Sequence, residues 1–136
     1  MTDVLYPLAK QSFLSQDPSI DMDTGTVKLR LVNITTDYTY SAAHQYVSSV
    51  TAYSGSTDQT LSNKTVALGV FDDTVGATFT AVAVDGTKTV GAVVMYIDSG
   101  VEATSPVIAY WDSFAAILPN GTDIDLAVHA SGFFAL

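Results

Sequence analysis

The sequence contains no cysteine among its 136 residues. This absence excludes disulfide bonds, thiolate metal sites and cysteine nucleophiles in one step. A small protein that must survive outside a cell without disulfides needs another source of support. Oligomerisation, or docking on a larger body, supplies that support.

Basic residues are scarce as well. Five lysine and arginine residues stand against fourteen acidic residues, which gives a formal net charge of −9. Binding to nucleic acid or to an anionic membrane requires clustered positive charge, so we expect neither partner. Two explanations of the acidic surplus stay open: solubility through self-repulsion, or an exposed face that must stay away from DNA and other acidic surfaces. The basic residues are scattered along the chain: Lys10, Lys28, Arg30, Lys64 and Lys88.

Long hydrophobic runs are also missing. Hydrophobic residues make up 48% of the chain and the mean hydropathy is +0.30, yet no run approaches the roughly 18–20 apolar residues that span a bilayer. The start, "MTDVLYPLAK", lacks the basic and apolar regions of a secretory signal. We therefore expect a single domain over residues 1–136 with a real core, in the cytoplasm where it is made.

Two short helices are predicted in the first half of the chain. "LYPLAKQSFLSQ" (5–16) has apolar residues at helical spacing, and Pro7 suits a first helical turn, where its missing N–H costs nothing. "SAAHQYVSSV" (41–50) fits a second helix, with Ser41 as its N-cap.

The rest of the chain favours strands. "TVKLRLVN" (26–33) alternates and predicts a half-buried strand, with Lys28 and Arg30 on the solvent side. Turn signals at Asp72-Asp73, Asp85-Gly86, Ser99-Gly100 and Pro119-Asn120-Gly121 separate the later segments. The expected fold is mainly β: an antiparallel β-sandwich or barrel-like sheet of about six to eight strands, with one or two short helices near the N-terminus. Further strands are predicted at 64–71, 77–84, 89–98, 106–112, 123–130 and 132–136.

Histidine and serine offer no catalytic pattern. His44 and His129 belong to no H-E-x-x-H or H-x-H motif, and local roles in structure are far commoner for lone histidines. The chain has no G-x-S-x-G elbow, no S-x-x-K, no G-x-G-x-x-G and no P-loop. We expect a protein that is not an enzyme, with no catalytic residues, no metal and no cofactor.

The acidic residues give no complete site either. "DMDTG" (21–25) begins like a calcium loop, but Val32 stands where the loop needs its glutamate. Asp21 and Asp23 are therefore predicted to be turn residues. A pair of carboxylates for glycoside hydrolysis is left as a minor alternative, because only proximity in space would reveal it.

The aromatic residues are the remaining candidates. Tyr38 and Tyr40 alternate along an extended "DYTY", so both side chains are predicted to point the same way. Core packing and a contact surface both stay open for them, since tyrosine is enriched at interface centres. The C-terminal "GFFAL" is predicted to complete the sheet. The candidate assembly contacts are Tyr38, Tyr40, His44, Tyr46, Phe133 and Phe134.

Several blocks together resemble one family. "LYPLAKQSFL", "VKLRLV", "DYTYSAAHQYV", "KTV…GVFD…TFTAV", "VVMYIDSG…TSPVIAYWDSF" and "LPNGTDIDL" follow one another from residue 5 onward. In this order they resemble a family of small virion structural proteins from tailed bacteriophages. "DYTYSAAH" and "YIDSG…TSPVIAY" are the most specific blocks. The family brings no catalytic residues to carry over.

The resemblance implies that the protein is a building block of a virion, and that it is made in the host cytoplasm. An acidic protein is poorly suited to the inner capsid wall, where DNA is concentrated. The first expectation is a capsid decoration (cement) protein on the outer surface of the head. Its partners would be the major capsid protein or other virion proteins. A trimer, a dimer and a monomer all stay open for the protein itself. The alternatives are a tail or neck component, a carbohydrate-binding module with an exposed aromatic platform, and a small hydrolase.

Overall fold

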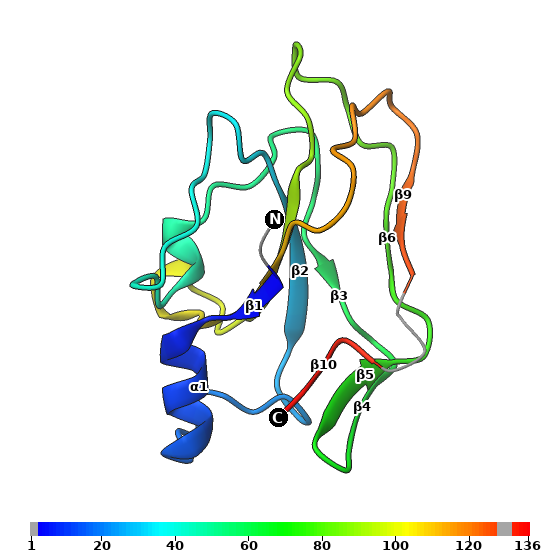
Figure 1. The fold of residues 1–136 in the computed structure, drawn as a ribbon. Coiled ribbons are helices and arrows are strands. Elements are labelled where there is room, and N and C mark those ends of the chain that lie inside the picture. The colour runs from blue at the N-terminus through cyan, green and yellow to red at the C-terminus, as the bar shows by residue number, and fades with distance from the viewer. Residues whose placement is uncertain (1–2, 128–131) are drawn as a thin grey trace.

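A computed structural model describes residues 3–127 and 132–136 as a mainly antiparallel β structure with one short α-helix (Figure 1). A five-stranded sheet has the order β1-β8-β7-β2-β3, a three-stranded sheet the order β10-β5-β4, and a two-stranded sheet pairs β6 with β9. The mainly β, antiparallel class predicted from the sequence is confirmed. The strands are β1 (Asp3–Leu5), β2 (Val27–Val32), β3 (Gln59–Thr60), β4 (Lys64–Ala67), β5 (Val70–Asp73), β6 (Ala77–Phe79), β7 (Ala92–Ile97), β8 (Val107–Trp111), β9 (Ile124–Leu126) and β10 (Phe134–Ala135).

The five-stranded sheet is built around β7, whose sequence AVVMYI is buried along its whole length. β2 pairs with β7 from Val27↔Ile97 to Val32↔Ala92, and β8 pairs along its other side. A continuous apolar run of this kind is typical of a strand that is buried on both faces. β2 differs from the prediction of a half-buried strand, because it is covered on both faces: Arg30 is only 6% exposed.

Helix α1 (Pro7–Leu14) confirms the predicted N-terminal helix within narrower bounds. Pro7 occupies the first turn, as expected from its fixed φ and missing N–H. Leu5 lies before the helix in β1, where it pairs with Ala109 of β8. The helix therefore starts directly from a strand of the main sheet and lies beside β8.

The predicted strand 64–71 is wrong as a single strand, because it is a hairpin of β4 and β5. Leu68 and Gly69 form its two-residue loop, and both have positive φ, 52° and 77°. Paired positive φ values are typical of a type I′ turn, for which Asn-Gly is the usual sequence. A leucine in the first position hides this turn from a reading based on composition.

The turn predicted at Asp72-Asp73 is also misplaced, since both residues belong to β5. Asp73 is buried, and its carboxylate accepts hydrogen bonds from the backbone N–H groups of Asn63, Val75 and Gly76. The chain turns just after it.

No α-helix forms over 41–50. Only Val47–Ser49 form a short 3₁₀ turn, η1. The Arg30 guanidinium donates to the backbone oxygens of Val47 and Val50, which holds this segment against β2. A second 3₁₀ turn, η2 (Glu102–Thr104), lies next to η1.

The later strands are shorter than predicted. The segment 77–84 keeps only β6, since Ala81 has a φ of 48° that ends the extended backbone. The segment 123–130 contributes β9, and its end, with His129, lies outside the described residues. β10 pairs with β5 through Phe134↔Phe71, so the prediction that the C-terminal segment completes a sheet is confirmed. The three sheets share one cluster of buried apolar residues.

Candidate functional site

A tyrosine cluster next to β8 contains three of the predicted contact residues. Tyr38, Tyr40 and His44 lie together, and the rings of Tyr38 and Tyr40 both contact Tyr110, with centroids 6.2 and 5.1 Å away. The prediction that the two tyrosines of "DYTY" point the same way is confirmed. Tyr38 is buried, whereas Tyr40 and His44 are half-buried. Tyr38 is therefore a core residue.

Hydrogen bonds order this cluster internally. The Tyr38 hydroxyl lies 2.7 Å from the Tyr6 hydroxyl and 2.9 Å from Nδ1 of His44. Burial raises the pKa of both Tyr6 and Tyr38 above the ordinary tyrosine range. A phenol whose pKa is raised stays protonated at neutral pH. The hydroxyls of Tyr6 and Tyr38 are therefore neutral, and their hydrogen bonds attach "DYTY" to the sheet.

The other three predicted contact residues lie elsewhere. Half-buried Tyr46 makes a β-bridge with Pro106. Half-buried Phe133 and Phe134 stack on Phe71 of β5, with ring centroids 5.9 and 5.6 Å away. The six candidates therefore form two separate groups with Tyr46 outside both.

An ion-pair network around Arg30 was not predicted from the sequence. The Arg30 guanidinium pairs with Asp58 at 2.9 Å and with Glu102, and its carbon lies 5.4 Å from the centroid of the Tyr96 ring. The Tyr96 hydroxyl donates to Asp58 at 2.5 Å. This network joins β2, β7, the loop that contains Asp58, and η2. Its role is to hold this loop and the two 3₁₀ turns against the sheet. Its two acids share one cation.

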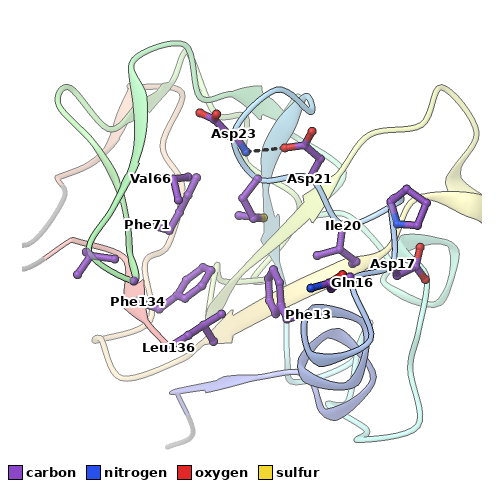
Figure 2. Close-up of a pocket in the computed structure, with 14 residues that line it drawn as sticks. Phe13, Gln16, Asp17, Ile20, Asp21, Asp23, Val66, Phe71, Phe134 and Leu136 are labelled. Carbon is purple, nitrogen blue, oxygen red and sulfur yellow. Dashed lines mark hydrogen bonds between the residues drawn. The ribbon is translucent and has the colours of Figure 1, made fainter.

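A groove of about 490 Å³ lies between the small sheet and α1 (Figure 2). One wall is the face of the small sheet, where Val66, Phe71 and Phe134 form a row across three paired strands. The opposite wall is made by Phe13 of α1 and by Ile20 in the segment that follows the helix. The lining is mainly apolar.

Three carboxylates lie along the side of the groove formed by residues 16–23: Asp17, Asp21 and Asp23. Asp21 accepts hydrogen bonds from the backbone N–H groups of Asp23 and Thr24, which confirms the predicted turn. Hydrogen bonds to Ser19 and Thr24 lower the pKa of Asp17 and Asp21 respectively, so both stay ionised at neutral pH.

Exposed apolar side chains belong to the groove lining or lie next to it in sequence. Leu68 at the hairpin tip is fully exposed, Val66 on β4 is 49% exposed, and Leu14 and Leu136 are also largely exposed. A soluble protein rarely gathers large apolar side chains around an apolar hollow unless something binds there. Sequence reasoning missed this groove because its walls come from segments about fifty to more than one hundred residues apart.

A second apolar hollow of about 230 Å³ lies on the far side of the C-terminal segment. It is lined by Val93, Trp111, Phe114, Leu126 and Phe133, together with Ala127 and Gly132. Since Phe133 lines this hollow and Phe134 lines the groove, the last strand separates the two.

Polar chemistry is sparse in the part of the chain that the structure describes. Residues 3–127 and 132–136 contain no group of three or more His, Asp or Glu side chains that could hold a metal ion. Buried side-chain nitrogen and oxygen atoms within these ranges all have a hydrogen-bond partner. No helix among them is long and apolar enough to cross a membrane.

Comparisons with known proteins give no relative. No family model, no curated protein and no solved structure matches the chain. The functional argument therefore depends on the residues and on their geometry.

Proposed function

We propose that this chain is a structural component of a bacteriophage particle, and within that class a capsid decoration protein bound to the outer surface of the head. The observation that carries the proposal is the mainly apolar groove with its surrounding exposed leucines and valine, on a chain of net charge −9. The sequence blocks that resemble small virion proteins support the same function.

The physical properties suit assembly better than catalysis. The groove walls are mainly apolar, and an apolar surface binds another surface by excluding water. Several charged groups are engaged with one another: buried Arg30 with Asp58, and the more exposed Lys88 with Asp37 at 3.0 Å. Such pairing leaves the carboxylates unsuited to act as a free acid and base.

The acidic charge favours the outer surface. A net charge of −9 disfavours contact with packed DNA, because like charges repel and no basic cluster is present to neutralise phosphates. The proposed partner is the major capsid protein, and binding at repeated positions would stabilise the shell through many modest interfaces.

A carbohydrate-binding module receives less support. Such a module needs exposed, coplanar aromatic rings, whereas five of the seven tyrosines are buried. The partly exposed Tyr40 ring is tilted by 41–43° against its neighbours. The buried tyrosines are Tyr6, Tyr38, Tyr53, Tyr96 and Tyr110.

Quantitative mass spectrometry of purified particles tests the proposal. The decoration function predicts a copy number comparable with that of the major capsid protein. A handful of copies per particle would instead place the protein in the tail or neck. Complete absence from particles would refute a structural function in the virion.

A further inference from the structure

The groove and the hairpin tip form one surface, which we call the docking surface. It consists of the groove lining, which includes Val66, together with Leu68. We propose that the docking surface binds an apolar segment flanked by lysine or arginine, and that a different virion protein supplies this segment. The inference rests on the proposed function and specifies which surface of the chain contacts the other virion protein.

The shape of the groove fits an inserted segment. The row Val66, Phe71 and Phe134 spans all three strands of the small sheet, and Phe13 faces the sheet from α1, with its ring centroid 6.3 Å from that of Phe134. Figure 2 shows these side chains directed into the space between the sheet and the helix. A volume of about 490 Å³ accommodates several apolar side chains.

Leu68 supports a contact at the hairpin tip. Its side chain is fully exposed and its φ of 52° lies in the left-handed region, where asparagine or glycine is favoured. Leucine at this position costs stability in both respects, since it strains the backbone and exposes apolar surface to water. Strained residues of this kind concentrate at functional sites, where a contact offsets their cost.

Charge decides what kind of segment binds. Asp17, Asp21 and Asp23 line the groove, and Lys64 is the basic residue beside them, with its Nζ bonded to the Asp23 backbone oxygen. The rim is therefore negative, and it favours a partner with positive flanks. A second copy of the chain would bring a further −9, so self-association through this surface is disfavoured.

Binding to particles prepared without this protein tests the apolar part of the proposal. Val66→Asp should weaken binding at least tenfold, because it places a charge in the apolar contact. The matched control is Val84→Asp, at a valine of similar exposure (58% against 49%) outside the groove lining, and it should bind within twofold of the unmodified chain.

Leu68→Asn separates contact from folding. Asparagine fits the positive φ, so this variant should unfold at a higher urea concentration and yet bind particles several-fold more weakly. Weaker binding by a more stable protein cannot result from misfolding. Unchanged binding of both Leu68→Asn and Val66→Asp would overturn the docking surface while leaving the proposed function intact.

The charge of the partner has its own test. Asp23→Lys should weaken binding and reduce its dependence on salt, whereas Asp125→Lys, on β9 and outside the groove lining, should change neither by more than about twofold. Equal or stronger binding by Asp23→Lys would refute basic flanks.

Light scattering of the free protein tests whether a second copy of the chain, and not another virion protein, occupies the docking surface. The proposal predicts that Val66→Asp leaves the oligomeric state unchanged. Self-association that is lost in Val66→Asp would show that a second copy fills the groove and would overturn the proposed partner. Failure of the unmodified chain to bind depleted particles would refute the proposed function itself.

Discussion

Replacement of Arg30 by methionine should remove a large part of the stability of this protein. Arg30 is 6% exposed, and its guanidinium makes contacts that no apolar side chain can replace. Its Nε donates to Asp58 at 3.0 Å, and its Nη1 donates to the Val50 backbone oxygen at 2.6 Å and to the Val47 oxygen at 3.3 Å. Arg30→Met keeps the volume and removes all of these donors.

The expected magnitude follows from what is left behind. The Asp58 side chain is 15% exposed, so its carboxylate would remain largely buried without a cation. Breaking a buried ion pair by removing one partner costs about 3–5 kcal/mol. With a slope of about 2 kcal/mol per molar urea, the midpoint of unfolding should fall by roughly 2 M. The single tryptophan, Trp111, reports the transition by fluorescence.

Glu102→Gln provides the control, because Glu102 also pairs with Arg30 but its side chain is 59% exposed. A solvent-screened pair contributes about 1 kcal/mol or less. The double variant Arg30→Met with Asp58→Asn should recover part of the loss, since the orphaned charge is gone. Equal effects of Arg30→Met and Glu102→Gln would refute the view that burial makes this network important.

Three further outcomes are expected. Tyr38→Phe should lower the free energy of unfolding by about 1–3 kcal/mol in urea titrations, because it leaves two polar partners unsatisfied; a loss below about 0.5 kcal/mol would contradict this. Leu68→Asn should raise the free energy of unfolding by about 1 kcal/mol, and a decrease would show that its positive φ carries no strain. Burial raises the pKa of Tyr6, Tyr96 and Tyr110, so the folded state holds protons that the unfolded state releases near pH 10. The contribution of these three tyrosines to stability is therefore fully present below about pH 10 and is lost as the pH rises further. Tyrosinate absorbance should rise together with the loss of circular dichroism. Full ionisation of all tyrosines in a protein that stays folded would refute this.

The parts of the fold that were predictable from sequence are those fixed by local pattern. The apolar run of β7 and the alternation of β2 give both strands within one to three residues at each end. The β4–β5 hairpin was missed because Leu68 occupies a turn position that usually carries asparagine. The ion-pair network around Arg30 was missed for another reason. Its acidic partners lie 28 and 72 residues further along the chain, and no local sequence pattern predicts contacts over such separations.

The candidate site shows the same limit. "DYTY" predicted the common direction of Tyr38 and Tyr40 correctly, but whether they face the core or solvent depended on Tyr110, seventy residues away. The groove needs α1, the hairpin and the C-terminal strand together. Its apolar residues looked like ordinary core or surface residues until the chain brought them side by side.

The order of strands in the main sheet has a consequence for synthesis on the ribosome. β1 has no partner strand until β8 is made, and β2 has only the two-residue β3 beside it until β7 is made. Closing such long loops makes folding slow, on the order of milliseconds to seconds for β proteins of this kind. Until then most of the "VKLRLV" strand has no partner along the edge that β7 later covers, and exposed strand edges of this type are what chaperones protect. A chain that stops before β8 is therefore expected to yield an aggregating fragment and not a smaller folded domain.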